Sequence, residues 1–276
     1  MTVLGAGRGP ATLGAVTLSL DEMQFLLEHL QIDEVPVVLN AIGRYDNETA
    51  HDAALAVAAQ SLTERELLDG EVVHPELADR LRGLYRPHWV IALRLVVAGQ
   101  VSRMCLSKGD DLVTVALRGP TSYVIDEADE DLPGPVLSAL GPAEGLELTG
   151  MNAPTEQLLP IFEDLGDAAA TTARLSEVCN PPRDAQVLAS ALVHLESHAE
   201  IVGVVYGDGT REIADNHIAV YNTRAGRFIA TASMSDDGVK WTSFSSGNNA
   251  RLRTALLDLI NSLPEREDFP GNPALA

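Results

Sequence analysis

The sequence predicts a β-sheet backed by helices and assembled from two similar halves. Apolar residues alternate with a period of two over residues 198–246, and glycine, aspartate and asparagine turns interrupt them, which is typical of an antiparallel meander with one buried face. A segment with leucines at helical spacing follows and stops at Pro264. The order of helices, four strands and a helix occurs twice, which indicates an internal duplication.

The first half, residues 16–142, opens with a short strand over residues 16–20 that leads into a helix. Ser19 and Glu22 have the spacing of a capping box, in which each side chain satisfies a free backbone amide at the helix start. The helix then buries four apolar side chains, those of Met23, Leu26, Leu27 and Leu30. An extended segment is expected at residues 36–39.

Three more helices are expected before the next strands, and each start is marked by a capping residue or by a proline in the first turn. These residues are Thr49 for a helix that runs to Gln60, Ser61 or Thr63 for a short helix, and Pro75 for the last one. The dipeptide Arg86-Pro87 is expected to end this last helix, because a residue before proline disfavours helical geometry.

Four strands of the first half follow, at residues 89–97, 101–107, 112–118 and 122–126. Alternate residues from Trp89 to Val97 share one face of the first of these strands. Glycine-containing turns separate the strands, the earliest being Ala98-Gly99-Gln100. An acidic loop at residues 126–131 and a short helix at residues 136–140 complete this half.

The second half, residues 143–264, repeats this order. Helices are expected at residues 154–163, 171–178 and 184–196, and the four-stranded meander and the last helix follow. Either half alone would leave an apolar sheet edge open, so we expect the two sheets to join into one layer. Residues 1–15 are expected to form a flexible lead-in and residues 265–276 a polar tail.

The composition restricts the class of partner. A net charge of −21 in 276 residues argues against nucleic acids and anionic membranes, because both require patches of lysine and arginine. No signal peptide and no long apolar segment is recognised, so we expect a cytoplasmic protein without membrane insertion. Cys105 and Cys179 are interpreted as small core residues in a reducing compartment.

Only one pair of residues suggests metal chemistry. His194 and His198 are four residues apart near the end of the helix expected at residues 184–196, with Glu196 between them. Helical spacing would place both imidazoles on one helix face, as two metal ligands require. No third ligand is apparent nearby, and a surface pair at a helix end is the competing interpretation. A small-ligand or metal-dependent enzyme that uses these histidines is the alternative function. No nucleophile or phosphate-binding motif is present, so neither an enzyme nor a cofactor is expected.

Four passages resemble the EspG family, the cytosolic chaperones of mycobacterial ESX (type VII) secretion systems. They are VTLSLDEM at 16–23, WVIALRLV at 89–96 with DLVTVALR at 111–118, GRFI at 226–229, and WTSFSSG at 241–247 before the last helix. The chain departs from the family after Leu263-Pro264, where the family often has a tryptophan and this sequence has Phe269.

The resemblance implies an α+β fold, with a central and mostly antiparallel sheet made of two quasi-twofold related repeats and flanked by helical bundles. It also implies a non-enzymatic function, which is to bind PE–PPE heterodimers at the apolar helical tip of the PPE subunit and to deliver them, soluble, to the ESX machinery.

The resemblance further implies two contact segments, matched by position. One is the loop between the first two long strands, with Val97, Ala98, Gly99, Gln100 and Val101. The other is the helix expected at residues 184–194, with Asp184, Gln186, Val187, Ser190, Ala191 and His194. An apolar patch with a polar rim would suit a helical client, although core packing is the competing interpretation for the valines and for Leu192.

Overall fold

The computed structural model describes residues 12–41, 45, 47–207 and 210–264. The strands of the first half are β1 (Val16–Ser19), β4 (Trp89–Val97), β5 (Gln100–Lys108), β6 (Val113–Arg118) and β7 (Ser122–Glu127). Those of the second half are β8 (Met151–Pro154), β9 (Leu195–Tyr206), β10 (Arg211–Thr223), β11 (Gly226–Met234) and β12 (Lys240–Ser246). Two short strands, β2 (Leu68–Asp69) and β3 (Val72–Val73), form a separate hairpin.

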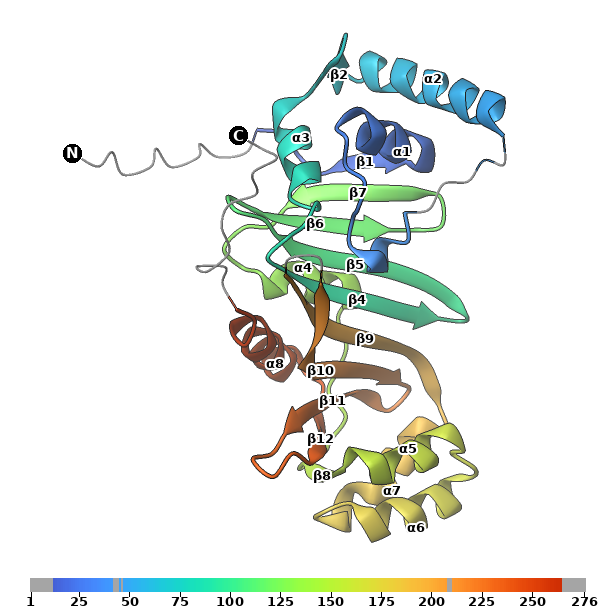
Figure 1. The fold of residues 1–276 in the computed structure, drawn as a ribbon. Coiled ribbons are helices and arrows are strands. Elements are labelled where there is room, and N and C mark those ends of the chain that lie inside the picture. The colour runs from blue at the N-terminus through green and yellow to red at the C-terminus, as the bar shows by residue number, and fades with distance from the viewer. Residues whose placement is uncertain (1–11, 42–44, 46, 208–209, 265–276) are drawn as a thin grey trace, which may run out of the picture.

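The ten longer strands form one antiparallel sheet in the order β1-β7-β6-β5-β4-β9-β10-β11-β12-β8 (Figure 1). The expected single layer is therefore confirmed. The two halves meet where β4 pairs with β9 over nine residues, from Trp89 opposite Val205 to Val97 opposite Ser197. In each half, the first strand in sequence becomes the outer edge strand of the sheet.

The described residues contain eight α-helices and two 3-10 turns. The helices are α1 (Leu20–His29), α2 (Glu48–Glu64), α3 (Pro75–Arg82), α4 (Pro133–Leu140), α5 (Thr155–Glu163), α6 (Ala168–Val178), α7 (Ala185–Leu192) and α8 (Asn249–Asn261). The 3-10 turns are η1 (Val37–Leu39) and η2 (Pro182–Asp184). Together with the sheet they make an α+β fold, as expected.

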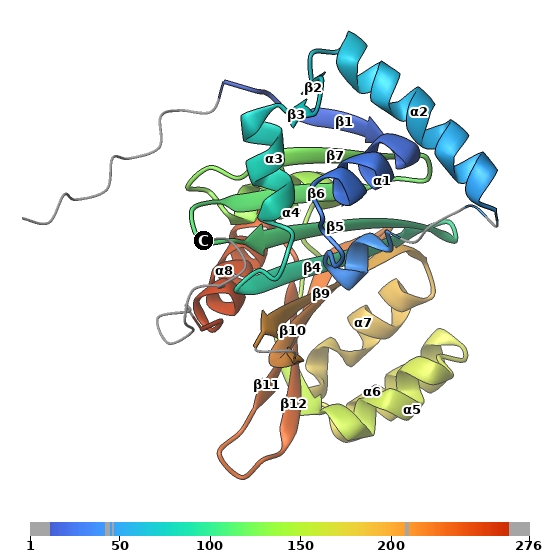
Figure 2. The ribbon, with the colours of Figure 1, turned by 45° about the horizontal axis from the view of Figure 1, so that its top comes forward.

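The helices lie on both faces of the sheet and produce three layers (Figure 2). The α1–α3 group covers one face over the first half, and the α5–α7 group covers the same face over the second half, because both cores use the same side of paired strands. Helices α4 and α8 contact each other and cover the opposite face. We call the first side the bundle face.

Because of this arrangement, the central strands are buried on both sides. In β4, Val90 and Ala92 belong to the core under α1–α3, whereas Ile91 and Leu93 belong to the core under α4 and α8. The same holds within residues 198–246: in β11, Ile229 belongs to the core under α4 and α8, whereas Phe228 belongs to the core under α5–α7. The prediction of a meander with a single buried face is therefore wrong for this strand. Strands buried on both faces read as continuous apolar runs, as the sequence WVIAL does.

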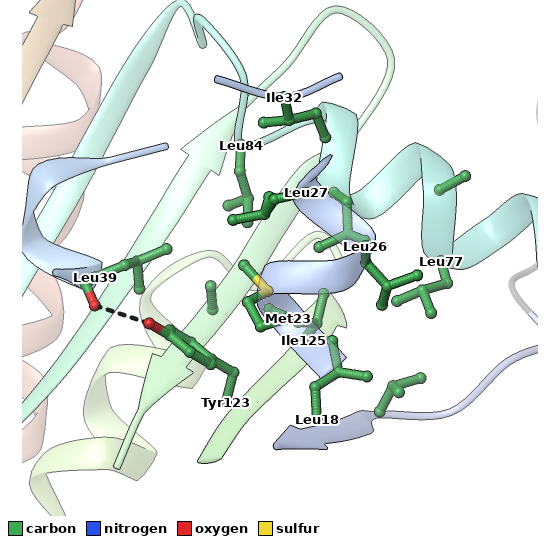
Figure 3. Packing of buried hydrophobic residues seen from close by; sticks show 14 of the residues in the cluster. Leu18, Met23, Leu26, Leu27, Ile32, Leu39, Leu77, Leu84, Tyr123 and Ile125 are labelled. Atoms are coloured by element: carbon green, nitrogen blue, oxygen red, sulfur yellow. Dashed lines mark hydrogen bonds between the residues drawn. The ribbon is translucent and has the colours of Figure 1, made fainter. Parts of the chain in front are cut away.

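The capping box at the start of α1 is confirmed. The Ser19 hydroxyl accepts a hydrogen bond from the Glu22 backbone amide at 3.1 Å, and the Glu22 carboxylate accepts one from the Ser19 amide at 2.7 Å. Figure 3 shows Met23, Leu26 and Leu27 of this helix pointing into the first core. Local sequence and tertiary packing therefore agree at this helix.

The segment expected to be extended at residues 36–39 instead contains the turn η1, over Val37–Leu39. The Leu39 amide donates to the Pro36 carbonyl at 2.9 Å, and Asn40 has a φ of 48°. The turn places the Leu39 side chain in the first core, and the Leu39 carbonyl accepts a hydrogen bond from the Tyr123 hydroxyl at 3.4 Å (Figure 3). Tertiary packing therefore decides the backbone conformation of this segment.

Helix α2 also differs from its prediction. Asn47, and not Thr49, caps it by accepting a hydrogen bond from the Ala50 amide at 2.8 Å. The helix continues to Glu64, so the short third helix expected from Ser61 does not form. The Ser61 hydroxyl instead donates to the Glu22 carboxylate at 2.8 Å, which joins α2 to α1.

Helix α3 begins at Pro75 as predicted but ends at Arg82, before Arg86-Pro87. Gly83 follows the helix and lets β6 approach closely, because a Cβ atom at this position would lie 2.6 Å from the Thr114 hydroxyl. The Thr12 and Leu13 amides donate to Glu76 of α3, so the chain from residue 12 is held against this helix. Residues 1–11 and 265–276 lie outside the described residues.

Candidate protein-binding surface

The tip of the β4–β5 hairpin is the first segment of the candidate surface. Its two-residue loop, Ala98-Gly99, has φ values of 48° and 79°, as in the primed turns that match the twist of paired strands. Val97 is 46% exposed, the next three residues are exposed, and Val101 is half-buried. The predicted turn is therefore confirmed, and it presents an apolar side chain beside an exposed amide, that of Gln100.

Helix α7 supplies the second segment. Its inner side packs into the core of the α5–α7 group through residues at helical spacing, namely Ala185, Leu188, Ala189 and Leu192. Gln186, Val187 and Ser190 lie on the outer side, where Val187 is 39% exposed. The outer side continues into the exposed residues Val193 and His194, which follow the helix.

Strand β9 brings these two segments to the same end of the sheet. It begins at Leu195, three residues after α7 ends, and its residue Ser197 lies opposite Val97. Figures 1 and 2 both show the β4–β5 tip and the start of β9 at this end, with α7 beside them. The exposed side chains of Val193 and Leu195 extend the apolar part of the surface. Sequence reasoning missed them because it placed both inside a helix.

An open hollow of about 480 Å³ borders the tip on the side of α4. The Val97 side chain faces it, and Arg224 and Glu196 flank it with an exposed ion pair of 3.6 Å. Val101, on the next strand, points to the bundle face instead, because adjacent positions of a strand alternate between faces. The tip therefore has apolar side chains on both of its sides.

Two residues of the predicted contact set, Asp184 and Ala191, are buried. The Asp184 carboxylate accepts hydrogen bonds from the Thr149 amide at 2.7 Å, the Thr149 hydroxyl at 2.6 Å and the Gly150 amide at 3.0 Å. These bonds fix the start of α7 to the segment before β8. In the free protein these two side chains therefore support the surface rather than form its outside.

The predicted helical metal pair is wrong in its geometry. Helix α7 ends at Leu192, so His194 lies in the turn after it and His198 lies in β9, opposite Val96. Residues 195–206 form a strand because they pair with β4 on one side and with β10 on the other, and this pairing overrides local helix preference. Among the described residues, no group of three or more histidine, cysteine, aspartate or glutamate side chains could hold a metal ion.

Neither cysteine has the environment of a reactive thiol. Both side chains are buried, and burial raises the pKa of Cys105 to about 12 and that of Cys179 to about 11. A thiol with so high a pKa is protonated at neutral pH and is a poor nucleophile. Both residues fill space in the core, as the sequence predicts.

Comparison with known proteins identifies the family. The model of the EspG family matches residues 19–258, which is most of the chain. The chain belongs to the EspG family.

One curated protein and one solved structure are similar to the chain over most of its length. The ESX-3 secretion-associated protein EspG3 of Mycobacterium tuberculosis (strain CDC 1551 / Oshkosh) is 25% identical over 290 aligned residues, which cover 95% of each protein. The solved structure of the M. tuberculosis type VII secretion system chaperone EspG5 in complex with a PE25–PPE41 dimer matches with a TM-score of 0.71. This match covers 91% of the present chain and 97% of EspG5 at 15% identity, so it shows a shared fold.

The Gly226-Arg227 pair, one of the passages that resemble EspG proteins, has a structural role here. Arg227 is buried, and its guanidinium donates to the Asn222 side chain at 2.6 Å and to the carbonyls of Leu140 and Gly141 at 2.9 and 3.0 Å. Burial lowers the pKa of this guanidinium. Arg227 therefore fastens the connection between the two halves to the β10–β11 hairpin.

Proposed function

We propose that this protein is a cytosolic EspG chaperone that binds a PE–PPE heterodimer and keeps it soluble until an ESX type VII secretion system exports it. The main support is membership of the EspG family together with a shared fold with EspG5, whose solved complex contains a PE25–PPE41 dimer. None of the described helices is long and apolar enough to cross a membrane. No catalytic chemistry is proposed, because EspG proteins are chaperones.

The proposed contact surface consists of the β4–β5 tip, namely Val97, Ala98, Gly99, Gln100 and Val101, and the outer side of α7, namely Gln186, Val187, Ser190 and His194. Val193 and Leu195 join it. Exposed valines beside polar amide and hydroxyl groups suit the apolar centre and the polar rim of a site for a helical client. Asp184 and Ala191 contribute by holding α7 in place.

We also propose that the halves 16–142 and 143–264 are quasi-twofold repeats, with an axis that passes through the sheet near Leu93 and Ile201. These two residues lie opposite each other at the middle of the antiparallel β4–β9 pairing. From this point outward, the connections on both sides follow the same order, with a four-stranded meander and then an edge strand. Each meander is followed by one helix, and these helices, α4 and α8, contact each other.

Co-expression tests the proposed function directly. Each PE–PPE pair of the host is expressed with and without this chain, and soluble complexes are separated by size-exclusion chromatography. We expect at least one heterodimer to elute with the chain and to precipitate or aggregate without it. If every pair stayed insoluble, or eluted apart from the chain, the proposal would be wrong.

A further inference from the structure

Three arginines form a row across adjacent strands of the bundle face. Arg94 of β4 lies opposite Arg103 of β5, and Arg103 lies opposite Arg118 of β6. Residues that are directly opposite in an antiparallel pair have side chains on the same face with Cβ atoms about 5 Å apart. We call Arg94, Arg103 and Arg118 the arginine row.

Such a row is locally unfavourable. Like charges directly opposite each other destabilise a pair of strands by several tenths of a kcal/mol. The chain has only 19 lysines and arginines against 40 acids, so adjacent arginines are not the result of a generally basic composition. A local arrangement that costs stability without a compensating internal contact is characteristic of functional surfaces.

Other side chains of the protein compensate the positive charge of the arginine row only in part. Arg94 forms a wide ion pair of 3.9 Å with Glu200 of β9, and both side chains are more than half exposed, at 54% and 61%. Arg118 donates to the Tyr123 hydroxyl at 3.0 Å and packs on the Tyr123 ring. Within the described part of the chain, Arg103 has no ion pair and no side-chain hydrogen bond.

Turn η1, helix α1 and the tip of the β4–β5 hairpin surround the arginine row. Turn η1 packs over β4, β5 and β6, and Asp21 of α1 lines a small hollow together with Arg118. Towards the hairpin tip, the next residues on the same face are Val96 and Val101, which lie opposite each other. The row therefore lies directly behind the apolar side of the β4–β5 tip.

We propose that the arginine row is a docking site for an acidic helical segment of the client, which extends the proposed PE–PPE contact beyond the hairpin tip and α7. This inference rests on the proposed function for the identity of the client. Its chemical basis is independent of that function, because planar guanidinium groups bind carboxylates through paired N–H donors.

The spacing of the row favours a helix that crosses the strands. Adjacent strands are about 4.8 Å apart, so successive arginines are offset by about this distance. Side chains three or four residues apart on a helix are about 5–6 Å apart at Cβ. A helix laid along the row would thus place glutamates or aspartates at this spacing over successive arginines, with the adjacent apolar stripe on Val96 and Val101.

The test uses the purified full chain and the PE–PPE heterodimer that binds it most tightly, with affinity measured by titration calorimetry at low and physiological salt. We expect Arg103→Gln to weaken binding about tenfold, or about 1.4 kcal/mol, and to reduce its dependence on salt. Glu200→Gln, which removes the internal acid that competes for Arg94, should tighten binding. Arg82→Gln on α3, a side chain 51% exposed, is the matched control and should leave the affinity unchanged.

If wild-type chain bound a heterodimer and Arg103→Gln bound it equally well at both salt concentrations, the docking site would be disproved while the chaperone function stood. A melting temperature that fell sharply in Arg103→Gln would point to a structural role instead. Relief of repulsion predicts an unchanged or higher melting temperature.

A second probe covers the case in which no heterodimer binds, which would contradict the proposed function. It is an alanine-rich helical peptide of about 20 residues with glutamates at every fourth position, and its control carries glutamines at the same positions. Binding of the glutamate peptide to wild type but not to the Arg94→Gln/Arg103→Gln double variant would support the row. Equal binding of both peptides, or of both proteins, would disprove it.

Discussion

Val97 lies directly opposite Ser197 at the last position of the β4–β9 pairing, so the tip of the first-half hairpin adjoins the chain leaving α7. This single register connects two segments that are about a hundred residues apart in sequence. It creates one contact surface from both halves of the protein. The predictions below test this surface, and the interactions that hold it in place.

The exposed side chain of Val187 should be important for binding but not for folding. Val187→Asp places a charge on the outer side of α7, and we expect it to weaken heterodimer binding at least about tenfold, because desolvating an unpaired carboxylate opposes burial in an apolar contact. The melting temperature should change little, because Val187 is outside the core. We expect Gln100→Arg at the hairpin tip also to weaken binding, because it too places an unpaired charge in the contact, and to leave the melting temperature nearly unchanged.

The control for these variants is Val57→Asp on α2, another exposed valine, which lies away from the proposed surface. It should leave both affinity and stability unchanged. A large loss of stability in Val187→Asp would mean that this side chain belongs to the core. Unchanged affinity in both surface variants would remove α7 and the tip from the contact.

Replacement of Arg227 by lysine should destabilise the fold. Lysine has one ammonium group and cannot reach Asn222, Leu140 and Gly141 together as the guanidinium does. We expect the free energy of unfolding to fall by about 3 kcal/mol, since the acceptor oxygens of Asn222, Leu140 and Gly141 would lose their charged donor. Urea denaturation measures this change, and Arg251→Lys in the exposed first turn of α8 is the control. Equal midpoints for the two variants would show that the Arg227 contacts contribute little.

Substitution by alanine at two hairpin glycines should lower the stability of the protein by different amounts. At Gly226, with a φ of 130°, a Cβ atom would lie 2.7 Å from the backbone nitrogen of Leu146, so we expect a loss of about 3 kcal/mol or more. At Gly99, with a φ of 79°, the space is open and only the backbone strain remains, about 1 kcal/mol. Thermal unfolding of the two variants side by side checks this order. A Gly99→Ala variant less stable than Gly226→Ala would contradict it.

The contact between Glu76 and the chain at residues 12–13 should depend on pH. The Thr12 hydroxyl, the Leu13 and Thr12 amides and, more weakly, Arg80 lower the pKa of the Glu76 carboxyl from 4.5 to about 2. A lowered pKa means that the ionised carboxylate stabilises the folded contact. The stabilisation is therefore complete above about pH 4.5 and is lost as the pH falls towards 2.

NMR titration of the Thr12 and Leu13 amides measures this transition, and their chemical shifts should stay constant down to about pH 3 and change below it. Glu76→Gln should abolish the transition. Glu156→Gln, an acid in the first turn of α5, should leave it intact. A midpoint for Glu76 near its ordinary value would mean that these hydrogen bonds do not persist in solution.

The sequence alone determined those features that arise from interactions between residues close together along the chain. Strand alternation with glycine turns located the two meanders, and the Ser19–Glu22 spacing located the start of α1, because hydrogen bonds between near neighbours decide both. The four passages also identified the EspG family, and the Ala98-Gly99 turn was recognised from its residue types.

Only the tertiary structure decided where long-range contacts overrule local preference. Residues 195 and 196 read as the end of a helix, yet they begin strand β9, which pairs with β4 on one side and with β10 on the other. Strand β8 was not predicted, since its four residues are held by long-range pairing, with β12 on one side and with Asn180 through a bridge at Asn152. The arginine row has no sequence signal, because its members are nine and fifteen residues apart, and strand register alone brings them together.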